Sequence, residues 1–478
     1  MSWLPVNRLR GHGAALVASR RGSIPVLFGL SLIPIIGMIG LGVDYGIATS
    51  NKTKLDMAAD AAAIAAVVTA KAYISSNAGQ TNVSANALAA GTTKAVNAFN
   101  ANMGNITFGQ VTLATPQVSR NAQTLTAVVS YSATVKNTIG PIFGTPTTLI
   151  SNTVTASADI ASYLDFYLLL DVSGSMGLPT SDEGMEKLAL KNNDLKEDNY
   201  RQGCQFACHF PGRVGWDLAA GKIQLRSDAV NDAVCSLIRR AALPLVPNQY
   251  RVGLYPFINQ MATLAGVTSD LATLSTTAQC SKPWPLALTN LLDTGSTQLF
   301  INGDPSTGTG SGGTHFETVL PQMKSTIATF GDGTAATSRK PFVFLITDGM
   351  QNDQNHSLLL GIKRYYPGDP SKFLLYPNAR WDGSKPKQID PSKCTDLKNA
   401  GATVSVLYIP YNIIKFQDFG GDVARENNLV NGFSPGLATP LRSCASPGFF
   451  YTANTPADIT ASLNAMFDQA LQVARLTR

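Results

Sequence analysis

The sequence predicts an α/β fold, built as a doubly wound parallel sheet, preceded by a transmembrane helix, a helical stalk and a small β-rich segment. Three observations support this prediction. Residues 24–43 form an uncharged apolar run, and residues 105–163 contain stretches of alternating hydropathy. From residue 164 onward, short apolar runs alternate with longer stretches of helical periodicity. Strands that alternate with helices in this way are typical of βαβ units and a parallel sheet.

The composition fits packed cores in more than one domain. The chain has 478 residues, of which 44% are hydrophobic and 14% charged. Its net charge of +6 is spread thinly, and no dense basic block follows the first 21 residues, so we expect no nucleic-acid partner. We predict an anchor and stalk at residues 1–75, a β-rich periplasmic spacer at 76–160, and an α/β domain at 161–478 with insertions at 178–216 and 350–393.

The apolar run at residues 24–43 predicts a single membrane crossing, since a helix needs about 20 residues to span the hydrocarbon core. Arg8, Arg10, Arg20 and Arg21 precede this run and Asp44 follows it. The positive-inside rule therefore places the amino terminus in the cytoplasm and the bulk of the chain in the periplasm or at the cell surface. The run is longer than the apolar core of a secretory signal, so we expect an anchor retained in the inner membrane.

A helix-forming, alanine-rich stretch at residues 51–72 extends the anchor into a stalk. Its ordered motifs are RRGS at 20–23, GVDY at 42–45, Leu55 and AADAAA at 58–63. Together with the apolar run they resemble the amino-terminal module of TadE/TadG-type proteins of the Tad (Flp) pilus machinery. The resemblance covers about the first 70 residues and implies a role in pilus assembly or adhesion. The chain lacks the glutamate of pilin subunits just inside the apolar run, so we expect no processing by prepilin peptidase.

The carboxyl-terminal part carries the expected strands and helices in alternation. Strands are predicted at 166–170, 250–258, 342–346 and 403–409, with an edge strand at 449–452. Helices are predicted at about 217–242, 316–330 and 456–476. The two insertions are expected to be surface loops, where the partner specificity of a binding domain would lie.

Polar side chains follow two of the buried strands. Residues 166–170 lead into Asp171, Ser173 and Ser175, and residues 342–346 lead into Asp348, with a Gly-rich stretch at 306–314 between them in the sequence. In open α/β sheets ligands bind beyond the carboxyl ends of the strands. Carboxylate and hydroxyl oxygens there predict a site for a hard divalent cation. The alternative is that these side chains only cap a turn and a helix.

These three loops resemble the von Willebrand factor A domain, a Rossmann-like fold with a metal-ion-dependent adhesion site (MIDAS). The resemblance implies five metal ligands, namely Asp171, Ser173, Ser175, Thr314 and Asp348. Thr307 and Thr309 are alternatives to Thr314. It also implies Mg²⁺ or Mn²⁺, with Ca²⁺ as a further candidate, and an open coordination position completed by an acidic side chain of a partner. We therefore predict a protein that is not an enzyme and that binds other Tad pilus components.

Two rival functions are a metal-assisted periplasmic hydrolase and a metal-dependent chaperone or sensor unconnected with pili. The sequence SGSMG at 173–177 is not a Gly-x-Ser-x-Gly nucleophile elbow, because serine fills its first position. The chain has only four histidines, His12, His209, His315 and His356. His315, beside Thr314, is the one candidate general base.

All six cysteines lie beyond residue 200, and their even number suits disulfides in an oxidising compartment. The segment from Cys204 through Cys208 to His209 has one residue too many for haem attachment, and zinc would lack two ligands. We therefore expect disulfides. Cys394 and Cys444 are a plausible pair, Cys235 and Cys280 are the remaining two cysteines, and other pairings stay open.

Overall fold

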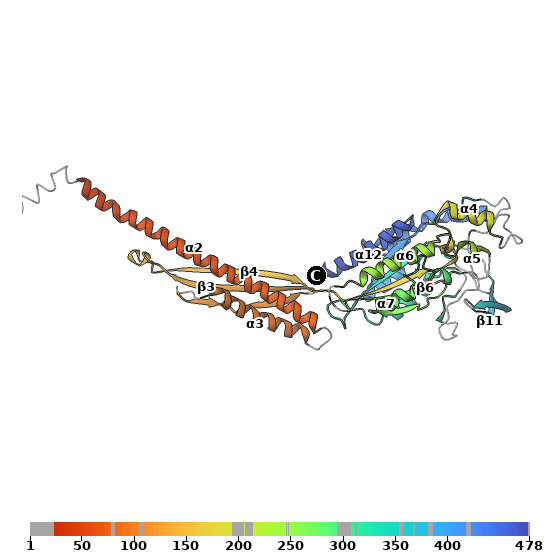
Figure 1. Ribbon diagram of the computed structural model, residues 1–478, viewed down its shortest axis with the longest axis horizontal. Helices are drawn as coiled ribbons and strands as arrows, with labels where there is room; N and C mark the ends of the chain where they lie inside the picture. The colour runs from red at the N-terminus through yellow and green to blue at the C-terminus, as the bar shows by residue number, and fades with distance from the viewer. Residues whose placement is uncertain are drawn as a thin grey trace, which may run out of the picture. The chain divides into compact units, whose positions relative to one another are not determined.

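The computed structural model describes residues 23–77, 82–104, 109–121, 123–193, 205, 214–244, 246, 248–293, 307–310, 313–352, 357–366, 369–380, 386–416 and 422–476 (Figure 1). The chain divides into two compact units, Met1–Ile160 and Ala161–Arg478. The domain boundaries drawn from the sequence at residues 75 and 160 stay predictions.

The first unit begins with α2, one continuous helix over Ser23–Ser76 that contains both the apolar run and the stalk. It is long and apolar enough to cross a membrane. Large side chains of the apolar run are exposed, whereas one side of the alanine-rich part is buried from Ala48 onward. The helix therefore has an apolar half with mostly exposed side chains and a half with one side in a protein core.

The alanine-rich half of α2 packs against α3 (Val83–Met103) and a four-stranded antiparallel sheet. The strands are β1 (Val111–Leu113), β2 (Gln117–Asn121), β3 (Thr124–Lys136) and β4 (Thr147–Asp159). Alternate residues of β3, from Leu125 to Val135, are buried. This alternation confirms the predicted strands with one buried and one solvent-facing side. The sequence did not predict α3. Gly91 of α3 lies so close to α2 that an added Cβ would be 2.9 Å from the Ala66 carbonyl oxygen.

The second unit is built on a six-stranded sheet with the order β14-β13-β8-β5-β6-β7. All neighbouring strands are parallel except β7, which runs antiparallel to β6. The strands are β5 (Leu164–Asp171), β6 (Tyr250–Phe257), β7 (Ala265–Thr268), β8 (Lys340–Thr347), β13 (Thr403–Tyr408) and β14 (Phe450–Thr452). From β5 the chain adds β6 and then β7 on one side, and it then adds β8, β13 and β14 on the other side. The predicted doubly wound α/β fold is confirmed.

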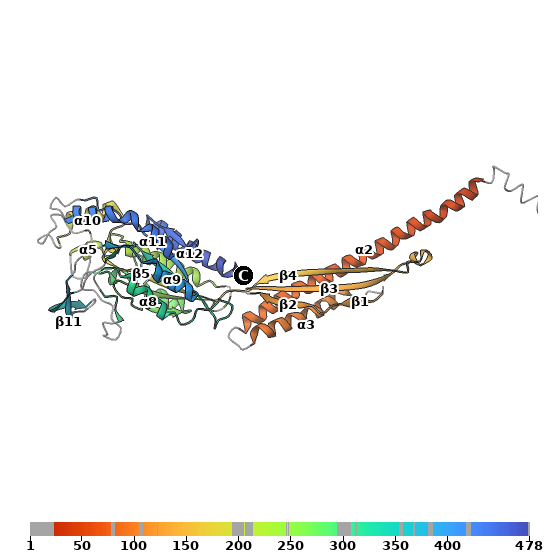
Figure 2. The same cartoon turned by 180° about the vertical axis from the view of Figure 1, so that it is seen from behind.

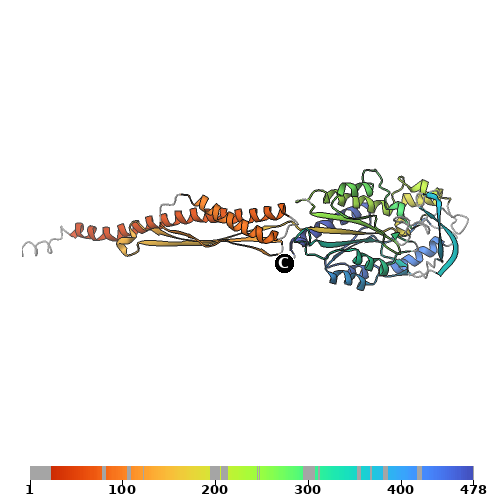
Figure 3. The same ribbon diagram turned by 90° about the horizontal axis from the view of Figure 1, so that it is seen from below.

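Helices cover both faces of this sheet, and Figure 3 shows the resulting three layers. Figure 1 is seen from the side of α6, α7 and α12, and Figure 2 from the side of α8, α9 and α11. Each face has its own apolar core. On one face the ring of Phe166 lies 4.8 Å from that of Phe467, and on the other Tyr167 and Leu169 share a core with Val319. Full burial of one such side chain contributes roughly 1.5–3 kcal/mol.

The helices of this unit differ from the sequence prediction in several places. Their bounds are α4 (Asp182–Lys191), α5 (Val214–Ala219), α6 (Arg226–Ala241), α7 (Leu271–Thr277), α8 (Phe316–Thr326), α9 (Pro391–Ala400), α10 (Asp422–Phe433), α11 (Ala438–Cys444) and α12 (Pro456–Leu476). The single helix predicted at 217–242 is wrong. Gly221 has a φ of +68° and interrupts it, and the Asp228 carboxylate accepts from the Leu225 backbone to start α6 anew.

The two insertions contain secondary structure of their own. Residues 178–216 include α4, whose N-cap Ser181 accepts a hydrogen bond from the Gly184 N–H. Residues 350–393 include the short strands β9 (Gln351–Asn352) and β12 (Pro386–Lys387), which pair with each other. They also include the hairpin of β10 (Ser357–Tyr366) and β11 (Asp369–Arg380). Both segments are therefore more regular than the loops that the sequence predicted.

Among the described residues of the second unit, two disulfides join its elements. Cys235 of α6 is bonded to Cys280 after α7, and Cys394 of α9 is bonded to Cys444 at the end of α11. Cys204 and Cys208 lie outside the described residues. The plausible pairing of Cys394 with Cys444 is confirmed.

A buried ion cluster ties together the amino ends of the three central strands. Asp165 of β5 is almost fully buried and accepts from the Arg251 guanidinium of β6 at 2.7 Å. Arg339, just before β8, approaches the same carboxylate at 3.5 Å and lies 5.4 Å over the Tyr163 ring. Asp165 therefore balances two arginines at the end of the sheet opposite the carboxyl ends of these strands.

We expect Asp165→Ala to lower the free energy of unfolding by about 2–4 kcal/mol, because it leaves the buried Arg339 guanidinium, and the half-buried Arg251 beside it, without a counter-charge. Chemical denaturation of the full chain measures this. Asp468→Ala is the matched control, since the Arg240–Asp468 pair is exposed and its loss should cost less than about 1 kcal/mol. Equal losses in the two variants would contradict a structural role for the cluster.

Candidate functional site

The candidate site lies where the strand order of the sheet reverses, between β5 and β8. Asp171 is the last residue of β5, and Thr347 is the last residue of β8. Because the two strands are parallel neighbours, their carboxyl ends deliver Asp171 and Asp348 to the same edge of the sheet. Both carboxylates are buried, with exposed fractions of 1% and 0%.

The first loop folds back onto its own aspartate. Asp171 Oδ1 accepts a hydrogen bond of 2.9 Å from the Ser173 backbone N–H, and a short 3₁₀ turn, η3 (Gly174–Gly177), comes next in the chain. The hydroxyls of Ser173 and Ser175 lie 3.1 Å apart. The alternating Asp-x-Ser-x-Ser spacing thus places one carboxylate and two hydroxyl groups on the same side of a single turn.

The second and third loops both reach Asp171. Thr314 Oγ1 lies 3.4 Å from Asp171 Oδ2, and Thr347 Oγ1 donates to the same oxygen at 2.6 Å. Gly313, with a φ of +102°, precedes Thr314, and its N–H donates to Asp293 Oδ2 at 3.3 Å. The structure therefore brings together three loops that are far apart in the sequence. Within the described part of the Gly-rich stretch, the contact of Thr314 with Asp171 supports Thr314 as the threonine of the site.

The two buried carboxylates make the site electrostatically unbalanced. Burial, together with the neighbouring Asp348 carboxylate, raises the pKa of Asp171 to about 7. Burial also raises the pKa of Asp348, and the guanidinium of Arg226 opposes that increase. Neither oxygen of Asp348 has a hydrogen bond of normal geometry, although the Ser175 hydroxyl and the Met350 backbone are near enough to lower its pKa. The site therefore contains carboxylate oxygens that accept no normal hydrogen bond and that are buried away from water.

Arg226 is a neighbour of the site that the sequence did not reveal. It is the first residue of α6, and its side chain is 2% exposed. Its Nη2 donates to the Pro410 carbonyl at 2.8 Å, and its Nη1 lies 3.7 Å from Asp348 Oδ2. The guanidinium carbon sits 5.3 Å from the centre of the Tyr411 ring. An arginine at the start of an amphipathic helix has no feature in the sequence that distinguishes it from a solvated one.

Thr347 and Asp293 are two further residues that the sequence analysis did not assign to the site. Thr347 precedes Asp348 in the third loop, and its hydroxyl donates to Asp171 while accepting from the Gly349 N–H at 2.9 Å. Asp293 fixes the backbone of both other loops, since its own N–H donates to the Val172 carbonyl at 2.9 Å. Thr347 could have been found from the sequence because it directly precedes the predicted ligand Asp348. Nothing in the sequence around Asp293 indicates that it lies near the site.

The donor set at this edge consists of hard oxygen atoms. Two carboxylates, two serine hydroxyls and one threonine hydroxyl suit Mg²⁺, Mn²⁺ or Ca²⁺ better than a soft metal. Within the described part of the chain, no cluster of three or more His, Cys, Asp and Glu side chains has a metal-binding arrangement. The orphaned acceptors of Asp348 and the raised pKa of Asp171 are what a cation at this position would relieve. The five residues therefore fit a hard divalent ion.

His315, the candidate base of the hydrolase alternative, is held by its own helix. It occupies the N-cap position of α8, and its Nδ1 lies 2.5 Å from Glu317 Oε1. This pairing within one turn gives the imidazole a local structural partner. His12, His209 and His356 lie outside the described residues.

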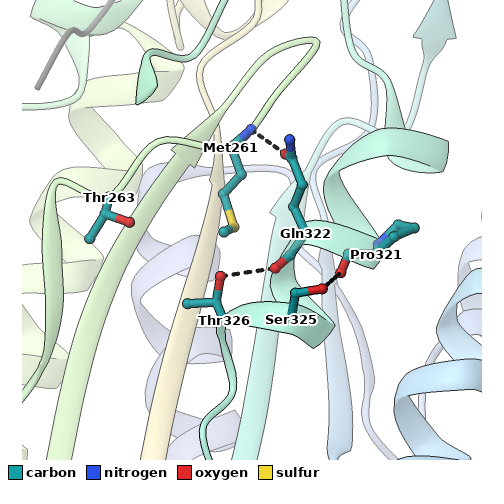
Figure 4. Close-up of a pocket in the computed structure, with 6 residues that line it drawn as sticks. All are labelled: Met261, Thr263, Pro321, Gln322, Ser325 and Thr326. Atoms are coloured by element: carbon teal, nitrogen blue, oxygen red, sulfur yellow. Dashed lines mark hydrogen bonds between the residues drawn. The ribbon is translucent and has the colours of Figure 1, made fainter. Parts of the chain in front are cut away.

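A separate shallow cavity of about 410 Å³ lies beside α8 (Figure 4). Its lining residues have no ionisable side chain, and none is a predicted metal ligand. Two of its polar groups are already paired, since Gln322 Oε1 accepts from the Met261 N–H at 2.8 Å and Ser325 Oγ donates to the Pro321 carbonyl at 3.1 Å. This cavity therefore offers no group for acid–base chemistry.

Comparison with protein families finds one match, which lies at the amino terminus. Residues 22–71 match the family described as "Putative Flp pilus-assembly TadE/G-like". The match confirms the resemblance drawn from the motifs around the apolar run, and it covers 50 of the 478 residues. No curated protein matches the chain.

Several solved structures are similar to the chain at low sequence identity. Proximal thread matrix protein 1 from the mussel byssus, with a zinc-occupied MIDAS motif, is 14% identical with a TM-score of 0.31, over 65% of this chain and 48% of that one. The vWF domain of the type V pili tip protein Mfa5 from Porphyromonas gingivalis is 14% identical with a TM-score of 0.31, over 67% and 98%. The pilus adhesin SpaC from Lactobacillus rhamnosus GG is 13% identical with a TM-score of 0.33, over 77% and 35%.

The chain therefore spans about half the length of the mussel protein and about a third of SpaC. The fold assignment stands on the strand order and the two helical layers, and these likenesses add nothing to it.

We expect Asp171→Asn to stabilise the second unit in the presence of a chelator at pH 8, by about 1–3 kcal/mol. Because folding raises the pKa of Asp171, the folded state favours its protonated form, and stability is lost as pH rises from about 4 through about 7. The amide carries no charge to bury. Denaturation of both proteins at pH 8 and pH 5 measures the difference, which should shrink at pH 5. A pH-independent difference would contradict the buried charge.

Proposed function

We propose that this chain is a membrane-anchored protein that binds protein partners through a divalent cation, in the assembly or adhesion of a Tad (Flp) pilus. The observation that carries the proposal is the meeting of three loops on Asp171 at the reversal point of the sheet. The pilus setting is supported by the family match at residues 22–71. The bulk of the chain is proposed to lie in the periplasm or at the cell surface, with the amino terminus in the cytoplasm.

The proposed ligands are Asp171, Ser173, Ser175, Thr314 and Asp348. We propose that the serine hydroxyls coordinate the ion directly and that the carboxylates bind directly or through water. With two carboxylates and neutral hydroxyls, the protein leaves the ion short of ligands, so a carboxylate from a partner can complete its shell. Mg²⁺ or Mn²⁺ are the proposed ions, with Ca²⁺ as a third candidate. Disulfides in the same unit are consistent with an oxidising compartment.

This function is a binding function, and we propose no catalytic role. A hydrolase would need a base oriented toward a serine of the first loop. The described contact of His315 Nδ1 is with Glu317, which orients the ring within its own helix. No contact within the described ranges favours the chaperone or sensor alternative.

We expect the full chain to bind Mg²⁺ or Mn²⁺ and Asp348→Ala to abolish that binding. Ser173→Ala should weaken cation binding by about 10- to 100-fold. Each of the two substitutions removes oxygen ligands that the small donor set cannot replace. Isothermal titration calorimetry measures the affinities. Ser325→Ala is the control, since this hydroxyl donates to a carbonyl of its own helix and lines the separate cavity. Equal affinity in wild type and Asp348→Ala would refute the site.

The same variants test the partner. Capture of interacting proteins from membrane extracts by the full chain should require the divalent ion and should be lost with chelator and with Asp348→Ala. It should persist with Ser325→Ala. Capture that survives both the chelator and Asp348→Ala would contradict adhesion through a bridging cation.

Arg226 provides a second, independent prediction. In the presence of a chelator, Arg226→Met should destabilise the protein by about 3–5 kcal/mol. The substitution removes the buried guanidinium that offsets the charge of Asp348. Added Mg²⁺ should restore more stability to this variant than it adds to wild type, because the ion supplies the missing positive charge. Thermal unfolding with and without the ion measures both effects.

The control is Arg442→Met, in which an arginine that lies over the Phe450 ring at the surface is replaced. It should show the same gain from Mg²⁺ as wild type. An equal gain in Arg226→Met and wild type would separate Arg226 from the cation site.

A further inference from the structure

We propose that the turn joining β3 and β4 enters the lipid bilayer beside α2. This turn, the hairpin tip, comprises residues 139–144 with the sequence IGPIFG and lies at the end of the hairpin in Figure 1. The inference rests on the membrane-anchor part of the proposed function and is independent of the cation site. It extends the membrane contact from one helix to a helix with a hairpin beside it.

The hairpin tip is packed against the apolar run of α2. A Cβ on Gly37 would lie 2.9 Å from the Phe143 ring, and a Cβ on Gly40 would overlap the Ile139 side chain. These glycines are one helical turn apart, so the lack of side chains lets the hairpin tip touch the helix at both. Gly37 lies six residues before the end of the apolar run, which corresponds to about 9 Å along the helix.

The position of this contact decides what surrounds the hairpin tip. Around Gly37 the helix exposes large apolar side chains, among them Ile33 at 64%, Met38 at 66% and Leu41 at 51%. If this part of α2 is inside a bilayer, then a side chain touching Gly37 is at the same depth. The hairpin tip itself exposes Ile142 at 75% and Phe143 at 46%, which is unfavourable in water and favourable in lipid.

The backbone of the hairpin tip is prepared for a medium without water. Non-helical backbone in hydrocarbon costs several kcal/mol for each polar group left unpaired. Here Asp44 of α2 accepts three backbone N–H groups, from Thr138 at 2.7 Å, Ile139 at 3.1 Å and Gly140 at 2.7 Å. The Asp44 carboxylate, at the end of the apolar run, therefore pairs the backbone N–H groups of the three residues that begin the turn.

Further donors of the turn are paired within it. Pro141 has no N–H to satisfy. The N–H groups of Ile142, Gly144 and Thr145 donate to carbonyls of residues 139–141, at 3.0, 3.2 and 2.9 Å. Water usually serves the backbone of an exposed turn, whereas internal pairing of this kind is required of a turn that meets lipid.

The occupant we infer is lipid and not a protein partner. The apolar surface of the hairpin tip continues the exposed apolar surface of α2, and both are fixed to each other by Asp44 and by the two glycine contacts. Whatever medium covers the helix at this height therefore also covers Ile142 and Phe143. A helix of this hydropathy is covered by acyl chains when it spans a bilayer.

The test places a tryptophan at the hairpin tip in the full chain, reconstituted in vesicles of phosphatidylcholine with and without brominated acyl chains. Ile142→Trp is the probe, and Ser157→Trp, at an exposed position near the far end of β4, is the matched control. Subtracting the wild-type emission isolates the added tryptophan. We expect brominated lipid to reduce the added emission of Ile142→Trp roughly twofold or more, and aqueous acrylamide to quench only the control.

Three outcomes would overturn the inference in distinguishable ways. If the protein does not float with the vesicles, the anchor itself is wrong, and the proposed membrane attachment falls with it. If the protein floats but acrylamide quenches Ile142→Trp as it does the control, only the hairpin tip is misplaced. If neither quencher reaches Ile142→Trp, protein covers this surface instead of lipid. Phe143→Trp repeats the measurement should Ile142→Trp fail to fold.

Discussion

The second unit depends on one constraint, which is the burial of the Asp171 carboxylate at the reversal point of the sheet. Its two oxygens collect the Ser173 N–H and the hydroxyls of Thr314 and Thr347. Through these contacts one side chain fixes the ends of β5 and β8 and the loop before α8. The cost is a second carboxylate nearby, because β8 delivers Asp348 to the same edge. Two buried carboxylates repel each other, and the described groups relieve that repulsion only in part.

Arg226 shows how the protein remains folded with this imbalance. Its guanidinium approaches Asp348 at 3.7 Å, which is too long for a good charge-assisted hydrogen bond. Its other contacts, to the Pro410 carbonyl and the Tyr411 ring, hold it there. The arginine thus offsets negative charge at a distance and leaves both Asp348 oxygens free of strong hydrogen bonds. A closer ion pair would saturate the carboxylate and remove it from the proposed set of cation ligands.

Local pattern in the sequence predicted the strands and the polar turns after them, whereas features created by packing were missed. The buried strands that lead to Asp171 and Asp348 were recognisable because apolar runs and polar turns alternate along the chain. The strand order then determined that these turns meet. Arg226, Asp293 and helix α3 were not recognisable, because their roles depend on neighbours that are distant in sequence. The helix predicted across Gly221 failed for the opposite reason, since a single glycine with positive φ outweighed the apolar periodicity on either side.

Two buried carboxylates of this chain, Asp44 and Asp348, differ in how far the fold uses their oxygens as hydrogen-bond acceptors. Asp44 is 4% exposed and accepts three backbone N–H groups, so its oxygens are used by the fold. Asp348 is fully buried, yet neither of its oxygens has a normal hydrogen bond. Burying an unsatisfied carboxylate is costly, and a sequence retains such a group where something outside the chain completes it. The contacts of Asp44 therefore make it the clamp of the hairpin, and the unpaired oxygens of Asp348 support its proposed role as a cation ligand.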